Sequence, residues 1–168
     1  MRFGPDNAHF LSSGGHGSMG FDIQAAIGAK LSSPDRPVIC IVGDGSAYMN
    51  IQELGFLSDS LLDIRIMVIN NGKLGIVSQF QNFNWGKDPT TGSFGGASLA
   101  SIAGGFGLHS TKVSTEDGLD DALSWLLEGD SSRFLEVMVD PDAVISPMLL
   151  AGQKIDEMWF QEVKIEQT

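Results

Sequence analysis

Length, composition and charge narrow the classes of protein to which this chain can belong. It has 168 residues, with twenty-one acidic and ten basic side chains and a formal net charge of −11 at pH 7, so neither nucleic acid nor an anionic membrane is expected as a partner. Hydrophobic residues make up 42% of the chain, too many for a disordered protein. The single cysteine, Cys40, excludes an internal disulfide framework and favours a reducing, cytoplasmic compartment.

Apolar runs and turn residues predict strands and helices that alternate along the chain. The expected elements are, in order, a weak strand at 8–11, a glycine turn at 14–20, a helix at 21–31, a strand at 38–42, a helix at 48–62, a strand at 65–69, an irregular loop at 73–96, a helix at 98–106, a strand at 109–113, a helix at 115–128 and a strand at 134–139. This alternation predicts an α/β fold of three layers, in which helices cover both faces of a mainly parallel sheet. We expect one domain over 1–140, followed by a tail at 141–168.

The glycine turn has two interpretations. Residues 15–20 read Gly-His-Gly-Ser-Met-Gly, which matches the fingerprint of nicotinamide-dinucleotide sites, and Asp44 could be the acid that follows such a site. The alternative is a tight turn that binds no ligand. Residues 1–110 carry eight acidic and six basic side chains, whereas residues 111–168 carry thirteen and four. A site for an anionic ligand is therefore expected in the first, nearly neutral part.

A carboxylate and an amide follow two of the predicted strands. Asp44 lies between Gly43 and Gly45 directly after one strand, and Asn71 lies 27 residues further on, with one helix and one strand between them. In a βαβ unit this spacing places both side chains at the same edge of the sheet. Their oxygens suit Mg²⁺, which takes few protein ligands and completes its octahedron with substrate phosphate and water. A turn with left-handed residues would explain the second segment but not the pair.

These residues carry a resemblance to a known family. Gly43–Ser46 and Asn70–Asn71 look like the GDG-to-NN signature of thiamine-diphosphate-dependent enzymes. The wider stretches SSGGHGSMGFDIQAAIGA, GDGSAYMNIQELGF and INNGKLGIVSQFQ resemble the C-terminal, diphosphate-binding domain of the acetolactate synthase and pyruvate-oxidase-like group. The resemblance runs from about His9 to Val139 and implies the thiamine-diphosphate-binding fold, with its first elements missing. The resemblance also implies that the glycine turn binds the aminopyrimidine of thiamine diphosphate rather than a dinucleotide.

The resemblance implies which residues hold the metal and the diphosphate. Asp44 and Asn71 would bind Mg²⁺ through side-chain oxygens, and Lys73 through its backbone carbonyl. Gly45 and Ser46 would hold the diphosphate through backbone N–H groups, with the Ser46 hydroxyl as a further donor.

It also implies contacts with the rest of the cofactor and with the substrate. Leu74 would lie beside the diphosphate, and the backbone of Gly17 and Met19 would meet the aminopyrimidine, while the Met19 side chain bends the cofactor. Phe80 and His16 would face the substrate channel. A packing aromatic and a turn histidine are the alternatives for these two residues.

The resemblance further implies that the chain holds only part of an enzyme. The family's activating glutamate comes from a separate pyrimidine-binding domain, usually across a subunit interface, so no catalytic residue is expected here. We expect a domain or subunit of a homo- or hetero-oligomer that acts on a 2-oxo acid by carboligation or decarboxylation. Some members also bind FAD. Isolated, the chain should be inactive, should expose an apolar face and should self-associate. A nicotinamide-binding domain and a non-catalytic relative remain as alternatives.

Overall fold

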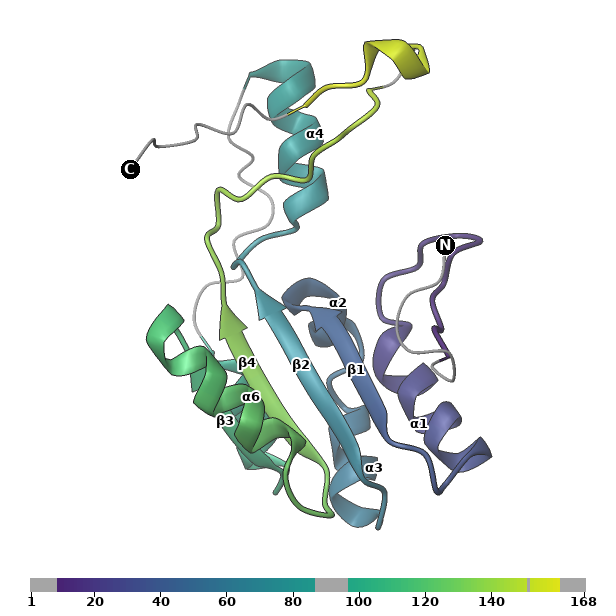
Figure 1. Ribbon diagram of the computed structural model, residues 1–168, viewed down its shortest axis with the longest axis vertical. Helices are drawn as coiled ribbons and strands as arrows, with labels where there is room; N and C mark the ends of the chain where they lie inside the picture. Colours follow the sequence, from purple (N-terminus) through teal and green to yellow (C-terminus); the bar gives the residue numbers. More distant parts are fainter. Residues whose placement is uncertain (1–8, 87–96, 151, 161–168) are drawn as a thin grey trace.

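The computed structural model describes residues 9–86, 97–150 and 152–160 (Figure 1). Its α-helices are α1 (Asp22–Ser32), α2 (Asp44–Met49), α3 (Glu53–Asp59), α4 (Gly75–Trp85), α5 (Leu99–Gly105) and α6 (Leu119–Leu127). Its strands are β1 (Val38–Gly43), β2 (Ile64–Asn70), β3 (His109–Val113) and β4 (Arg133–Met138), and short 3-10 helices lie at Glu116–Gly118 and Ile155–Glu157. None of the helices in these ranges is long and apolar enough to cross a membrane.

The four strands form one parallel sheet in the order β1-β2-β4-β3. In the register of β1 against β2, Gly43 lies opposite Ile69, and in that of β2 against β4, Asn70 lies opposite Met138. The carboxyl ends of all four strands therefore meet at one edge of the sheet, which is the usual place for a ligand in an open α/β fold.

Helices cover both faces of this sheet, which confirms the predicted three-layer α/β fold. On one face, apolar residues of α1, α2, α3 and α5 pack with inward residues of the strands such as Ile66 and Phe134, both fully buried. On the other face, α6 packs through Leu126 against Leu135 and Val137 of β4. Figure 1 shows α6 in front of the sheet and α2 and α3 behind it.

The single helix predicted at 48–62 is wrong, because the structure has two shorter helices there. α2 begins four residues earlier, at Asp44, and ends at Met49, and α3 follows from Glu53. Between them, the Asn50 side chain donates a hydrogen bond of 2.6 Å to the carbonyl oxygen of Gly20. This contact with a distant turn stabilises the break between the two helices, and helical periodicity contains no information about it.

The irregular loop predicted at 73–96 is also wrong over its first half, which forms α4. The helix extends beyond the carboxyl edge of the sheet, and the tail packs along its side (Figure 1). The Gln79 side chain forms two hydrogen bonds of 2.8 Å with the backbone of Ile145, and the rings of Phe83 and Trp159 meet edge to face at 5.0 Å. Residues 87–96 of that loop and 161–168 of the tail lie outside the described residues.

The weak strand predicted at 8–11 is not formed by residues 9–11, and Ala8 lies outside the described residues. Residues 9–13 have no regular secondary structure before the turn that begins at Gly14. The glycine turn is therefore not entered from a strand within the described part of the chain.

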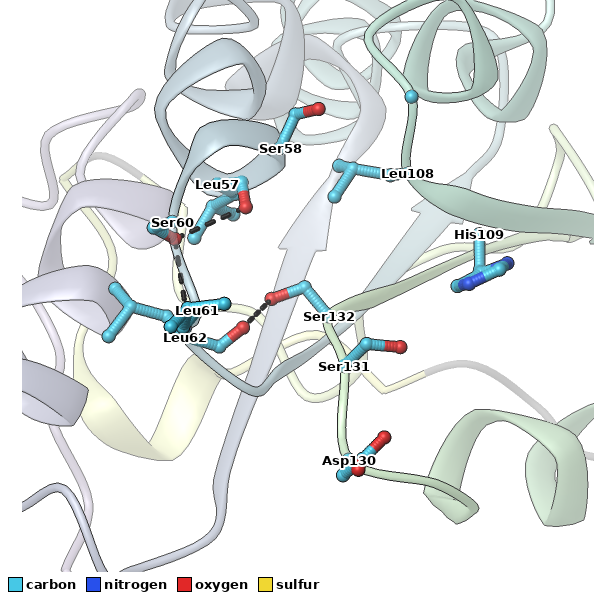
Figure 2. A pocket seen from close by; sticks show the side chains of 11 residues that line it. Leu57, Ser58, Ser60, Leu61, Leu62, Leu108, His109, Asp130, Ser131 and Ser132 are labelled. Carbon is cyan, nitrogen blue, oxygen red and sulfur yellow. Dashed lines mark hydrogen bonds between the residues drawn. The ribbon is translucent and has the colours of Figure 1, made fainter.

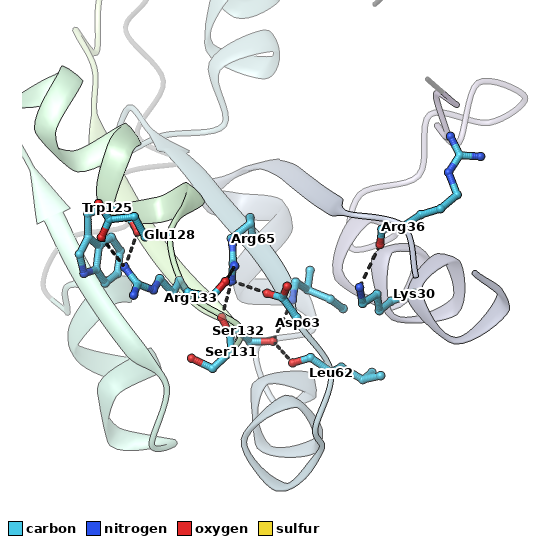
Figure 3. Close-up of polar contacts among 12 residues, drawn as sticks. Lys30, Arg36, Leu62, Asp63, Arg65, Trp125, Glu128, Ser131, Ser132 and Arg133 are labelled. Carbon is cyan, nitrogen blue, oxygen red and sulfur yellow. Dashed lines mark hydrogen bonds and ion pairs between the residues drawn. The ribbon is translucent and has the colours of Figure 1, made fainter. Parts of the chain in front are cut away.

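Polar side chains close the amino ends of β2 and β4, at the edge opposite the carboxyl ends (Figure 3). The Ser132 hydroxyl donates to the Leu62 carbonyl at 2.7 Å and accepts the N–H of Ile64 at 3.1 Å. The buried Arg65 donates to the carbonyl oxygens of Ser131 and Gly129 and pairs with Asp63. These bonds satisfy backbone groups that would otherwise be buried without partners.

Candidate functional site

The carboxyl edge of the sheet brings Asp44 and the turn after β2 together. Asp44 is the residue that follows the last β1–β2 pair, Gly43 with Ile69, and Asn71 follows the last residue of β2. The backbone amide of Gly72 acts on the Asp44 carboxylate, where it partly opposes the rise in pKa that burial causes. The two segments that the sequence paired are thus neighbours in space.

Asp44 is a buried carboxylate with one oxygen left unsatisfied. Asp44 is only 3% exposed, and its Oδ2 atom has no hydrogen-bond partner among the described residues. Burial raises the pKa of Asp44; the backbone amides of Gly45 and Gly72 oppose this rise, and the negative charge of Glu136 adds to it. A buried oxygen without a donor is costly, and a divalent cation would satisfy it. The residues present therefore fit a metal at this position.

The turn from Asn70 to Lys73 presents further oxygen atoms at the same edge. The Asn71 side chain accepts a hydrogen bond of 3.1 Å from the Lys73 N–H through Oδ1, and Gly72 has a left-handed φ of 71°. A Cβ atom on Gly75 would lie 2.7 Å from Nδ2 of Asn71. The position of the Asn71 amide thus depends on glycine at residue 75. The Lys73 ammonium pairs with the exposed Asp142 of the tail at 3.1 Å.

The glycine turn is fastened to the start of α2. The Gly20 N–H donates to the Ser46 hydroxyl at 2.7 Å, and that hydroxyl donates to Oδ2 of Asp22 at 2.7 Å. Ser46 therefore uses its hydroxyl to hold the turn. The backbone N–H groups of Gly45 and Ser46, in the first turn of α2, are the remaining donors for an anion, and that of Gly45 also acts on the Asp44 carboxylate. Met19, 43% exposed, and Gly17, with a φ of 63°, lie on this turn.

The remaining predicted residues lie around these two turns. Leu74 is half-buried and directly precedes α4. Phe80 lies on α4 with 38% of its surface exposed, and His16 lies exposed on the glycine turn. Both side chains are exposed to solvent.

Sequence reasoning missed Glu136, a fully buried carboxylate in β4. It accepts hydrogen bonds from the Asn70 side chain at 2.7 Å, the Ser98 hydroxyl at 2.5 Å and the Ala100 N–H at 2.9 Å. Burial acts to raise its pKa, but these hydrogen bonds and the positive charge of Lys112 outweigh burial and lower it. The available signal was an acid inside the apolar run FLEVMV.

A shallow cavity lies at the other end of the sheet (Figure 2). It measures about 340 Å³ and includes His109, Asp130 and Ser132 in its lining. The Ser132 hydroxyl is held between Leu62 and Ile64, as described above. This cavity lies at the amino ends of the strands, so it is separate from the Asp44 site.

Comparison with known proteins identifies the family of the chain. The family described as "Thiamine pyrophosphate enzyme, C-terminal TPP binding domain" matches residues 1–137. The chain belongs to this family. This TPP-binding domain lacks, in residues 9–13, the strand that a nicotinamide βαβ unit would place before its glycine turn.

The relatives of this TPP-binding domain include synthases and a decarboxylase. It is 38% identical over 147 residues to a probable acetolactate synthase large subunit of Methanococcus aeolicus, covering 87% of this chain and 24% of that protein. It is 37% identical over 150 residues to the acetolactate synthase isozyme 1 large subunit of Escherichia coli strain K12, covering 89% and 27%.

Among solved structures, it resembles the Rhodococcus jostii RHA1 thiamine diphosphate-dependent 4-hydroxybenzoylformate decarboxylase. The TM-score is 0.68 and the identity 34%, over 75% of this chain and 24% of that one. The chain thus spans about a quarter of the length of these relatives.

Proposed function

We propose that this domain binds thiamine diphosphate through a Mg²⁺ ion, as part of an enzyme that acts on a 2-oxo acid. Asp44 and Asn71 provide side-chain oxygens to the ion, and Lys73 provides its backbone carbonyl. The observation that carries the proposal is the buried Oδ2 of Asp44, which has no hydrogen-bond partner in the described part of the chain and lies beside the turn that bears Asn71 and Lys73. One carboxylate with neutral oxygens suits an ion that also takes phosphate and water as ligands.

The start of α2 and the glycine turn each bind a different part of the cofactor. Backbone N–H groups of Gly45 and Ser46 donate to the diphosphate, and Leu74 packs beside it. Gly17 and Met19, on the glycine turn, contact the aminopyrimidine. The bridge from Gly20 through Ser46 to Asp22 fixes the spacing between the glycine turn and the start of α2, which supports a role in orienting both ends of one molecule.

Bound thiamine diphosphate supplies an electron sink that allows a 2-oxo acid to lose CO₂ or to join a second carbonyl compound. The residues of this chain bind and orient it, and Phe80 and His16 line the approach of the substrate.

The activating glutamate is on a pyrimidine-binding domain or subunit outside these 168 residues. FAD is a further cofactor of the complete enzyme if it follows the flavin-binding members. The names of the relatives, acetolactate synthase and 4-hydroxybenzoylformate decarboxylase, support carboligation or decarboxylation.

Calorimetric titration of the full chain tests this function, with thiamine diphosphate and Mg²⁺, with thiamine diphosphate and EDTA, and with NAD(H). We expect binding only in the first case, and none by Asp44→Ala. Asp59→Ala, at an exposed acid that ends α3, is the matched control and should bind normally. The same titrations are repeated with a pyrimidine-binding domain added.

Other results would support the alternatives. NAD(H) binding that survives EDTA would identify a nicotinamide domain instead. Binding of neither ligand, even with the pyrimidine-binding domain present, would identify a non-catalytic relative.

A further inference from the structure

Glu136 is a buried charge that none of the proposed cofactor contacts uses. It lies in β4 opposite Val68 of β2, while Asn70 lies opposite Met138. Because side chains alternate along a strand, Glu136 and Asn70 face the same side of the sheet. That side is packed with apolar residues, so an ionised group at this position has a cost that its partners must offset.

Among the described residues, the polar groups that contact the Glu136 carboxylate are donors. Its Oε1 accepts from Nδ2 of Asn70 at 2.7 Å and lies 3.6 Å from the Lys112 ammonium. Its Oε2 accepts from the Ser98 hydroxyl at 2.5 Å and the Ala100 N–H at 2.9 Å. An ionised carboxylate is acceptor-only, whereas a glutamine of the same shape presents two N–H donors of its own. The set of partners therefore specifies a carboxylate.

The bond to Glu136 determines which way the Asn70 amide points. With Nδ2 directed at the carboxylate, Oδ1 is directed at the backbone N–H of Gly72, which donates to it at 2.8 Å. The Asn70 carbonyl accepts the Val139 N–H at 2.9 Å, so its backbone is fixed as well. A continuous set of hydrogen bonds thus runs from Glu136 through Asn70 to the centre of the Asn71–Lys73 turn.

We infer that Glu136 is a positioning residue for the Mg²⁺ turn: it orients the Asn70 amide, which holds the Gly72 N–H and so fixes the oxygens of Asn71 and Lys73. It touches neither metal nor cofactor. The inference rests on the proposed function, since it takes these oxygens as the metal ligands. Groups that orient metal ligands in this way change metal affinity by about 10- to 100-fold when they are replaced.

Glu136→Gln in the full chain tests the inference with two measurements. Calorimetry at saturating thiamine diphosphate gives the Mg²⁺ Kd, which we expect to rise about tenfold or more. Amide hydrogen exchange, followed by NMR without metal or cofactor, should be about tenfold faster at Gly72 than in the original chain, because its N–H loses an oriented acceptor. Thermal unfolding without cofactor records the loss of stability separately.

Ser132→Ala is the matched control. It removes two hydrogen bonds, one buried and one partly buried, at the amino ends of the same strands (Figure 3), so it should lower stability while leaving the Mg²⁺ Kd and Gly72 exchange unchanged. Asn70→Ala should reproduce the effect of Glu136→Gln, and the double variant should be no worse than Asn70→Ala alone. If Glu136→Gln fails to fold, Asn70→Ala carries the test, because it leaves Glu136 with its other three donors.

Three results distinguish a positioning role of Glu136 from a purely structural role and from a failure of the proposed function. A Mg²⁺ Kd within twofold of the original in Glu136→Gln, or an equal rise in Ser132→Ala, would overturn the positioning role and leave a purely structural carboxylate. Unchanged exchange at Gly72 would overturn it as well. If the original chain binds no Mg²⁺ with thiamine diphosphate, even with a pyrimidine-binding domain added, while Gly72 exchange still responds to Glu136→Gln, the hydrogen-bond relay stands and the proposed function fails.

Discussion

At the scale of single residues, the site contains a carboxylate whose burial opposes folding. Asp44 has a raised pKa, mainly because it is buried, and its Oδ2 lacks a partner among the described residues. A residue that is unfavourable for stability and well placed for a ligand is typical of a functional site, where stability and activity conflict. Two substitutions, one at Asp44 and one at Gly75, test stability and Mg²⁺ binding separately.

Asp44→Asn should stabilise the cofactor-free chain at pH 7 while abolishing Mg²⁺-dependent binding. The raised pKa means that ionisation of Asp44 costs folding free energy above the pKa of an unfolded aspartate, and that this cost disappears as the pH falls through the folded value. We expect a gain of about 1–3 kcal/mol, measured by thermal unfolding, that shrinks towards acid pH. Asp59→Asn should change stability by less than about 0.5 kcal/mol. A destabilised Asp44→Asn at pH 7 would contradict the account.

Gly75→Ala should weaken Mg²⁺ binding without weakening the fold. The added Cβ would lie 2.7 Å from Nδ2 of Asn71, so the Asn71 amide must move, while alanine favours the helix that starts there. We expect a Mg²⁺ Kd raised by about tenfold, measured by calorimetry, with an unchanged or higher unfolding midpoint. Gly28→Ala, in α1 with open space around it, is the control. Equal Kd values for the two variants would show that Asn71 does not bind the metal.

At the scale of helices and strands, α4 is held by the tail rather than by the sheet. Gln79→Ala should release the segment around Ile145 from α4, because it removes both hydrogen bonds to Ile145. Limited proteolysis should then cut this segment several-fold faster, while the sheet core keeps its unfolding midpoint within about 2 °C. Asn84→Ala, an exposed residue of the same helix, should leave the cleavage rate unchanged. A parallel loss of core stability in Gln79→Ala would contradict this division.

The same contacts explain what the sequence could and could not predict. All four strands of the sheet were predicted to within one residue at each end. β1, β2 and β4 are mostly apolar runs, as is usual in parallel sheets, whereas β3, at an edge of the sheet, has the more polar sequence HSTKV. α4 was missed because its contacts, such as Phe83 with Trp159, are made with the tail. The break at Asn50 depends on Gly20, thirty residues earlier.

The candidate site, too, could be predicted only in part from the sequence. The pairing of Asp44 with Asn71 followed from strand spacing alone. The Ser46 hydroxyl was predicted as a donor to the diphosphate, but it bridges Gly20 and Asp22. The partners of Glu136 come from three separate elements, so only the folded chain brings them together.

At the scale of the whole molecule, β1 leaves an apolar surface uncovered. It is an edge strand, and its Ile39 and Ile41 are 53% and 60% exposed, although strands of parallel sheets are normally covered on both faces. The isolated chain should therefore self-associate, and Ile39→Lys with Ile41→Lys should shift it towards monomer in sedimentation velocity at 10–100 μM, on the order of a protein-interface affinity. A chain that is monomeric throughout this range would contradict the prediction.

The most direct test of the central claim is to locate the ion itself. A crystal structure of the chain with thiamine diphosphate and Mn²⁺ in place of Mg²⁺ would mark the metal by its anomalous scattering. The account predicts one peak within about 2.0–2.3 Å of Oδ2 of Asp44, Oδ1 of Asn71 and the Lys73 carbonyl oxygen. A peak elsewhere on the chain, or a diphosphate bound at this edge with no metal between it and Asp44, would contradict it.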